Sequence, residues 1–139
     1  MSETRAASRL PSSRPLSPHI QIYRRMMTMM MSIVHRITGA GLYAGTLLLA
    51  WWLLAVALGP EAYGAFADFI GSWFGRLVLF GYTWALIHHM LGGLRHLFWD
   101  MGRGFDLATI EVTAWGALIG SVTLTAIVWI FGYWMMGVF

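Results

Sequence analysis

With 58% hydrophobic and only 11% charged residues, the 139-residue chain cannot form a soluble domain with an apolar core and a charged surface, so it belongs in a bilayer. Its net charge is +3, and its basic residues, all arginine, are concentrated near the N-terminus, which indicates orientation in a membrane and argues against nucleic-acid binding. The absence of cysteine excludes disulfides, Fe–S ligation and thiol chemistry, so a metal would need His, carboxylate or Met ligands.

Residues 1–25 form a polar, basic arm ahead of the apolar part of the chain. By the positive-inside rule, this arm is expected to stay in the cytoplasm. No short apolar run with a small-residue cleavage site marks a secretory signal, whereas the Arg- and Ser-rich composition of residues 1–14 leaves a mitochondrial transit peptide as an alternative. Prolines predict that the end of the arm is extended along a protein surface or the headgroup layer, namely Pro11, Pro15 and Pro18.

Residues 26–139 are predicted to form an all-α integral membrane-anchor domain with three transmembrane helices, at about 37–58, 77–97 and 114–138. The first apolar run alone corresponds to about 33 Å of helix, which crosses a hydrocarbon core about 30 Å thick. Residues 59–72 contain no Lys or Arg and are predicted to form an outward-facing loop. An odd number of spans places the C-terminus outside.

Ser32, His35 and Arg36 share one helical face just before the first span, at positions i, i+3 and i+4. Arg36 alone could be a positive-inside anchor at the membrane edge. A serine, a histidine and an arginine on one face are more than an anchor requires. Together they predict a site for an anionic or carbonyl-bearing ligand at the membrane interface.

The segment HHMLGGLRHLFWD, which begins at His88, places several histidines at the end of an apolar helix. His89 and His96 stand on one face, beside glycines that leave room for a flat cofactor or a closely packed helix. His88 is rotated about 100° from that face and is expected to hydrogen-bond across a helix interface. His89 is expected to lie about 9 Å into the membrane from Arg95, deeper than His35.

These residues are consistent with a haem site, in which the neutral His89 imidazole binds iron and Arg95 and His96 meet the propionates near the aqueous edge. The motifs of serine and zinc hydrolases and the P-loop are absent from the sequence. A six-coordinate haem needs two axial ligands, and His35 is expected to lie too close to the surface to be the second. The second ligand is therefore expected from another subunit.

Three segments, RPLSPHIQIY, SIVHRITG and HHMLGGLRHLFWDMGRG, occur in this order with apolar spans between them. In this pattern the chain resembles the cytochrome b membrane-anchor subunit of succinate dehydrogenase, the larger of the two anchors of respiratory complex II. The resemblance implies that His89 is an axial ligand of haem b, and that Ser32 and Arg36 line the ubiquinone pocket. It also implies that His35 lies near the haem propionates, with Arg36 beside them.

The resemblance further implies a bundle shared with a smaller membrane-anchor subunit, which would supply the opposite haem ligand. A flavoprotein subunit with FAD would oxidise succinate, an iron–sulfur subunit would carry the electrons, and ubiquinone would be the substrate reduced beside this chain. This chain would then perform no succinate chemistry itself. Three residues would form a network on the inner side, namely Arg95, His96 and Asp100. The arm fits a bacterial inner membrane better than the mitochondrial inner membrane.

Two alternatives share these features. One is the anchor of a fumarate reductase, which would have the same architecture and run the chemistry in reverse with a lower-potential quinone. The other is a membrane bundle without redox function, in which His89 and Arg95 form a proton or ion relay.

Overall fold

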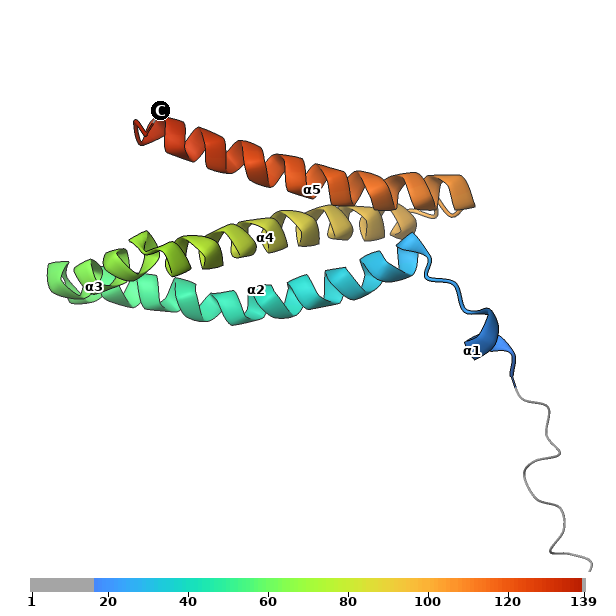
Figure 1. The fold of residues 1–139 in the computed structure, drawn as a ribbon, viewed down its shortest axis with the longest axis horizontal. Helices are drawn as coiled ribbons and strands as arrows, with labels where there is room; N and C mark the ends of the chain where they lie inside the picture. The colour runs from blue at the N-terminus through green and yellow to red at the C-terminus, as the bar shows by residue number, and fades with distance from the viewer. Residues whose placement is uncertain (1–16, 139) are drawn as a thin grey trace, which may run out of the picture.

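Three long helices dominate the structure, a computed structural model that describes residues 17–138. They are α2 (Met27–Leu58), α4 (Trp73–Asp100) and α5 (Leu107–Met135), and each is long and apolar enough to cross a membrane. Figure 1 shows α4 between α2 and α5, with α5 diverging from α4 toward the C-terminus. These helices confirm the prediction of an all-helical chain with three candidate membrane spans.

The helices extend beyond the apolar spans that the sequence defines. α2 has 32 residues, or about 48 Å of helix, and begins at Met27, well before the predicted span at 37–58. Because the hydrocarbon core is about 30 Å thick, one end of α2 projects into the interface. Ser32 and His35 lie within this first part of α2.

The segment predicted as an outward-facing loop instead forms a helix, α3 (Pro60–Gly71). Gly59, with φ of 106°, ends α2, and Pro60 takes the first position of α3, where its fixed φ and missing N–H are tolerated. α3 packs beside the end of α2, where Trp51 contacts Phe66 edge to face with ring centroids 5.0 Å apart. The loop prediction was wrong because the residues that end one helix here also begin the next.

The described part of the N-terminal arm contains one helical turn, α1 (His19–Ile22), preceded by Pro18. An extended segment was predicted, and this turn corrects it, because proline is tolerated just ahead of a helical turn. An extended backbone follows at Tyr23, before α2. Pro11 and Pro15, which entered the same prediction, lie outside the described residues.

A short connection joins α4 to α5 and includes two glycines with positive φ, Gly102 (72°) and Gly104 (75°). Asp106 begins α5 by accepting a hydrogen bond from the backbone N–H of Thr109 at 2.8 Å. This bond lowers the pKa of Asp106, so the carboxylate stays charged at the positive end of the helix dipole.

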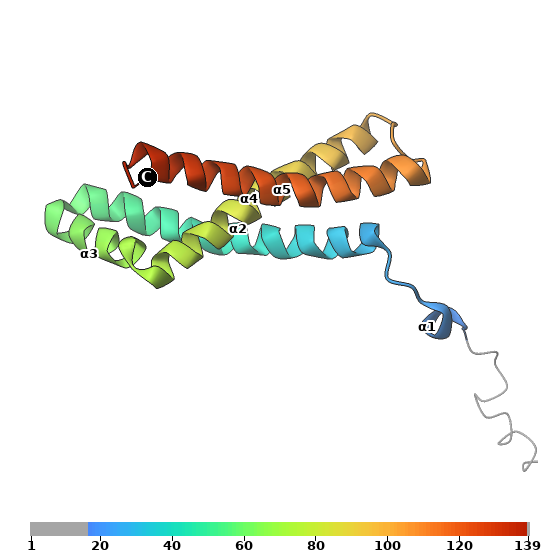
Figure 2. The ribbon, with the colours of Figure 1, turned by 45° about the horizontal axis from the view of Figure 1, so that its top comes forward.

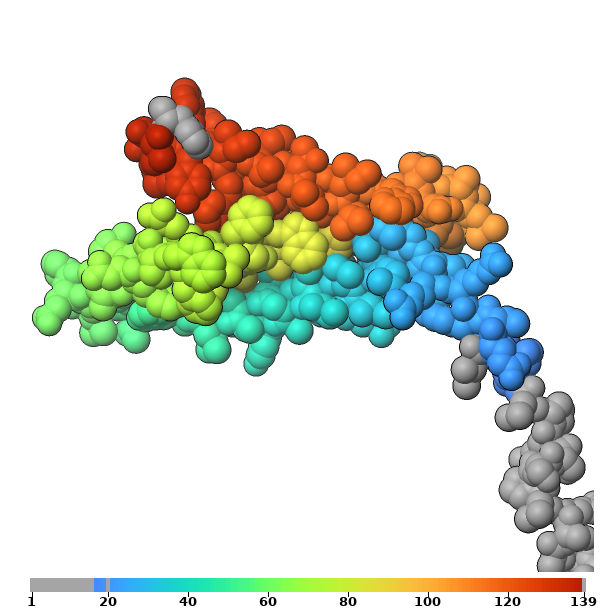
Figure 3. Space-filling view, viewed as in Figure 1, coloured from blue at the N-terminus to red at the C-terminus, as the bar shows by residue number. Residues whose placement is uncertain are grey.

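α4 crosses between the other two long helices at an oblique angle (Figure 2), and its side chains fill part of the space between them (Figure 3). On α5, small residues face this crossing and are buried, including Ala114, Ala117 and Ser121. Small residues let helices approach closely in a bilayer, where no hydrophobic effect drives them together. Most large apolar side chains remain on the outside, as expected of a chain surrounded by lipid.

A buried polar contact crosses the interface between α4 and α5. His88 Nδ1 lies 3.1 Å from the Ser121 hydroxyl oxygen, which itself donates to the Leu118 carbonyl at 2.8 Å. Because that hydroxyl proton is already used, the His88 Nδ1–H is the donor to Ser121. His88 is 2% exposed and its ring stacks on Trp84 with centroids 5.2 Å apart. The predicted hydrogen bond of His88 across a helix interface is confirmed.

Ser121→Ala is expected to leave the buried His88 Nδ1–H without an acceptor, which costs about 1–3 kcal/mol. The apparent melting temperature of the protein, measured in mild detergent in the assembly in which it purifies, should therefore fall. Thr123→Ala is the matched control, because Thr123 lies on the exposed face of the same helix. Equal melting temperatures for the two variants would contradict the assigned role of Ser121.

Candidate functional site

Two histidines join α2 to α4 through reciprocal hydrogen bonds. The His35 Nε2–H donates to the carbonyl oxygen of His89 at 3.2 Å, and the His89 Nδ1–H donates to the carbonyl oxygen of His35 at 3.1 Å. The two rings stack with centroids 4.0 Å apart and planes 12° from parallel. Because a carbonyl oxygen only accepts, each ring must carry its proton on the nitrogen that faces the other helix.

The second ring nitrogen of His89, Nε2, has no hydrogen-bond partner among residues 17–138. The Thr38 hydroxyl lies 3.4 Å from Nδ1 and donates to the His35 carbonyl at 2.9 Å, so it supports the same side of the ring. A histidine that donates through Nδ1–H to a backbone carbonyl is oriented to bind a metal through Nε2. The chain therefore presents one pre-oriented imidazole nitrogen.

Glycine makes room for each of the two rings. A Cβ atom at Gly39 would lie 3.0 Å from the His89 Cε1 atom, and a Cβ at Gly92 would collide with the His35 Cδ2 atom. Gly93 differs from its neighbour, because it is exposed and a Cβ there would meet nothing within 4 Å. Of the two glycines that the sequence places near the histidines, only Gly92 is needed by a ring.

His35 and His89 lie at the same level of the bundle, since their rings stack directly. The expectation that His89 lies deeper than His35 is therefore wrong. The prediction measured depth as the number of residues from the polar end of each helix. Because α4 crosses α2 obliquely (Figure 2), the same number of residues along the two helices does not correspond to the same depth in the membrane.

A small cavity of about 70 Å³ lies beside the histidine pair and is lined by residues of α2, α4 and α5. Its polar side chains are neutral or cationic, and its lining contains no acidic residue. Such a lining suits a carboxylate or a carbonyl oxygen. The polar residues that line it are Thr28, Ser32, His35, His88, Arg95 and His96. Arg36 is exposed on α2 and lies outside this lining.

Arg95 points from α4 toward α5. Its Nε lies 3.4 Å from the Thr113 hydroxyl and one terminal nitrogen lies 3.5 Å from the Ile110 carbonyl oxygen. Its guanidinium carbon is 4.9 Å from the centre of the Trp99 ring. These long contacts hold the cation at the edge of the cavity and leave its N–H groups available to an anion.

His96 also faces this region, with its ring centroid 5.3 Å from that of His35 and in edge-to-face contact with Trp99 at 5.1 Å. Asp100 is exposed at the end of α4, and within residues 17–138 it has no hydrogen bond to Arg95 or His96. Of the three residues predicted to form an inner-side network, the structure thus brings Arg95 and His96 to one cavity and leaves Asp100 outside it.

Sequence reasoning did not identify Thr113 or Trp99, which hold Arg95, nor Thr28 on the first turn of α2. Thr113 could have been suspected, because a threonine in an apolar helix often serves an interhelical contact. Trp99 gave no such signal, since tryptophan is also usual at membrane interfaces.

Residues 11–128 match the profile of the family described as Succinate dehydrogenase/Fumarate reductase transmembrane subunit. The chain belongs to this family. It is 42% identical to the succinate dehydrogenase cytochrome b556 subunit of Paracoccus denitrificans, over 83% of this chain and 88% of that protein. Against the b556 subunit of Rickettsia felis the identity is 32%, over 91% and 99% of the two chains. Against the mitochondrial b560 subunit of Sus scrofa it is 37%, over 83% and 68%.

The chain is therefore a membrane-anchor subunit of the succinate dehydrogenase complex and a multi-pass membrane protein. The resemblance drawn from its three motifs is confirmed. Membership in this family also implies that other succinate dehydrogenase subunits are its partners, and it favours the anchor interpretation over an ion relay without redox function.

In this anchor subunit, Gly92→Ala is expected to displace the His35 ring and break its bond to the His89 carbonyl, at a cost of about 1–3 kcal/mol. The measurement is the apparent melting temperature of the purified complex. Gly93→Ala is the matched control and should be neutral or slightly stabilising, because alanine favours a helix and meets open space.

A double variant sharpens this test. In a chain that already carries His35→Ala, the ring is absent, so Gly92→Ala should cost little. If Gly92→Ala remained equally destabilising in that background, the conflict with the His35 ring would not be the cause.

Proposed function

We propose that this subunit binds haem b at its boundary with the smaller anchor subunit, with His89 Nε2 as one axial ligand. The observation that carries this proposal is the His89 Nδ1–H bond to the His35 carbonyl, which leaves Nε2 as a fixed and open donor atom. The names of the relatives as cytochrome b556 and b560 subunits support the same cofactor.

A second protein ligand for this haem would come from the partner subunit. His35 would not supply it together with His89, because the two rings stack at 4.0 Å with no space for a metal between them. His88 is buried against Ser121 on α5 and faces away. This chain therefore contributes one ligand of a shared site.

The cationic cavity beside the histidine pair fits the propionates of such a haem. Arg95 and His96 supply the donors, and an arginine can bind a carboxylate through two parallel N–H bonds. His35 lies at the same edge, but its Nε2–H is already donated to His89, so its main part is to hold the His89 backbone and ring. When bound, haem b would supply a one-electron redox centre.

Ser32 and Arg36 form the part of the ubiquinone site that belongs to this chain. Both are exposed near the interfacial end of α2, one helical turn apart, and the Ser32 hydroxyl has no partner among residues 17–138. A hydroxyl donor and a guanidinium near one quinone carbonyl stabilise the negative charge that develops there during reduction. Reduction to the quinol takes two electrons and two protons, and the interfacial position gives the protons access from water.

The orientation follows from charge. Arg24 and Arg25 precede α2 directly, so the arm of residues 1–25 lies in the cytoplasm and the C-terminus lies on the other side. The flavoprotein with FAD and the iron–sulfur subunit dock on the cytoplasmic side, and succinate is oxidised there. A bacterial cell membrane is the proposed location. The ratio of succinate oxidation to fumarate reduction by the purified complex separates this function from that of a fumarate reductase.

The haem assignment is tested by a matched pair of asparagine variants. An asparagine amide can replace the Nδ1–H donor of histidine but has no atom at Nε2. In the assembled complex, His89→Asn is expected to keep the bond to α2 and to lose the b-type haem absorbance. His88→Asn keeps its bond to Ser121 and should retain the haem. If only the His88 variant lost the haem, His88 and not His89 would be the ligand, and the proposed assignment would be wrong.

The quinone assignment is tested by succinate-dependent ubiquinone reduction in the purified complex. Ser32→Ala is expected to slow turnover about two- to tenfold and Arg36→Ala about tenfold or more, as the loss of a neutral and a charged hydrogen bond would give. Succinate oxidation with a soluble dye should be unchanged, because it takes place in the partner subunits. Arg103→Ala, in the connection between α4 and α5, is the control. Normal quinone reduction in both α2 variants would contradict the site.

A further inference from the structure

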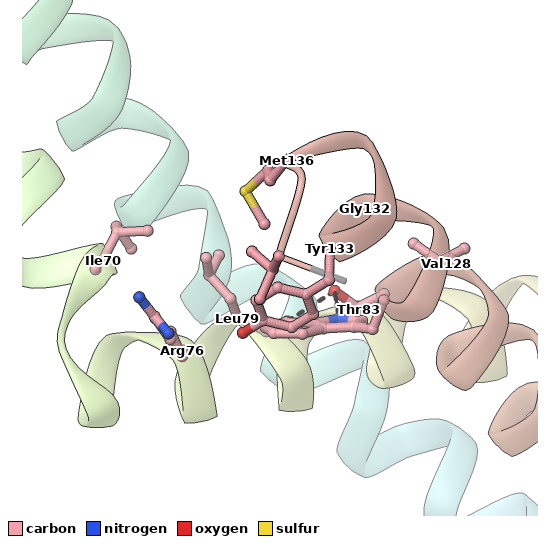
Figure 4. A pocket seen from close by; sticks show the side chains of 11 residues that line it. Ile70, Arg76, Leu79, Thr83, Val128, Gly132, Tyr133 and Met136 are labelled. Carbon is pink, nitrogen blue, oxygen red and sulfur yellow. Dashed lines mark hydrogen bonds between the residues drawn. The ribbon is translucent and has the colours of Figure 1, made fainter.

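A second cavity has a volume of about 640 Å³, and Figure 4 shows the residues that line it. It lies at the other end of the bundle from the histidine pair. It forms where α5 diverges from α4 beside the end of α3 (Figure 1). Its walls are mainly apolar and come from α3, α4 and α5. Ile70 lies on α3, Leu79 on α4 and Val128 on α5, and Met136 directly follows α5. A gap of this size in a membrane protein must be filled by lipid, by a hydrophobic ligand or by another chain.

One fixed charge lies at the rim of this cavity. Arg76, in the first turn of α4, reaches toward the cavity beside Ile70 (Figure 4). It has no acidic or carbonyl partner among residues 17–138, and arginine stays charged in proteins. α4 begins and α5 ends at this level, so Arg76 lies at the boundary between membrane and water.

Below this cation the cavity is apolar and its deeper polar groups are already paired. Thr83 lies about 10 Å further along α4 than Arg76. Its hydroxyl donates to the Leu79 carbonyl at 2.7 Å and accepts from the Trp129 indole N–H at 3.3 Å. The depth of the cavity therefore suits a hydrocarbon chain, and Thr83 and Trp129 have no donor left for a quinone carbonyl.

We infer that this cavity is a binding site for an anionic phospholipid, with the phosphate on Arg76 and one acyl chain along the wall formed by Leu79 and Val128. The site matches the lipid in charge at the rim, in apolarity below it and in depth within the bilayer. A helix of a partner subunit would match this charge only by bringing a carboxylate to Arg76 at the same level. The inference is independent of the proposed haem and quinone sites, which lie at the other end of the bundle.

The test measures phosphatidylglycerol retained by the intact complex after purification in mild detergent, by native mass spectrometry and by lipid extraction. Arg76→Gln is expected to lower the retained amount about tenfold or more, as loss of a charge-assisted hydrogen bond would give. Arg76→Lys should keep most of it. Arg103→Gln removes an arginine in the connection between α4 and α5 and should change nothing.

A second variant fills the cavity and leaves its charge in place. Gly132 lines the cavity, and a Cβ there would meet nothing within 4 Å, so Gly132→Leu can be accommodated. It should lower phosphatidylglycerol retention with Arg76 intact. If Arg76→Gln prevented assembly, the phosphatidylglycerol retained by the other two variants would still test the inference. Arg76→Lys should retain most of it, and Gly132→Leu should retain less.

The occupant is identified by replacing Val128 with a photo-reactive phenylalanine analogue. After illumination, the mass of the chain should increase by that of one phospholipid. Three results would overturn the inference: retention of phosphatidylglycerol unchanged in Arg76→Gln and Gly132→Leu, loss of ubiquinone instead of phospholipid in these variants, or a cross-link from position 128 to a polypeptide. None of these readouts depends on succinate or quinone turnover, so failure here leaves the proposed haem and quinone functions to their own tests.

Discussion

The contact between His35 and His89 is the interaction on which the arrangement of α2 and α4 depends. In a bilayer, helices associate through close packing and hydrogen bonds, because lipid is as apolar as their own side chains. Each imidazole here donates to the carbonyl of the other histidine, and each packs over a glycine of the opposite helix, Gly39 or Gly92. The same contact that fixes the crossing of the helices therefore also fixes the direction of His89 Nε2.

The polar groups divide into those that build the bundle and those left open for a partner. Among the described residues, no buried side-chain nitrogen or oxygen lacks a hydrogen-bond partner. His88 and Ser121 belong to the first kind, since they satisfy each other inside the interface. Ser32, Arg36 and His89 Nε2 belong to the second kind: Ser32 and Arg36 lie on the first part of α2, and His89 lies on α4 at the level of His35. An open polar group on a membrane chain is costly unless a ligand, water or another subunit meets it, which is why these groups indicate function.

The sequence was sufficient wherever a property depends on one helix alone. Apolar runs gave the three candidate spans, and the rotation of His88 away from His89 gave their different environments. It was insufficient wherever two elements had to be related in space. The common level of His35 and His89 depends on the crossing angle of α4, and Gly92 differs from Gly93 only through the ring opposite it. The helix at Pro60–Gly71 was missed for a local reason, because Gly59 and Pro60 can end one helix and begin the next.

The cavity beside the histidine pair and the cavity beside Arg76 differ in the side chains that α5 brings to them. Beside the histidine pair, α5 contributes the small residue Ala117 to a cavity of only about 70 Å³, whose other walls come from α2 and α4. Further along, Trp129 occupies the interface, with its ring against Phe80 at 5.3 Å, and the helices separate around about 640 Å³. α5 thus contributes a small residue to the narrow, cationic cavity at one end of the bundle and larger residues to the wide, apolar cavity at the other. The narrow end can bind a polar group tightly, and the wide end can accommodate a hydrocarbon chain.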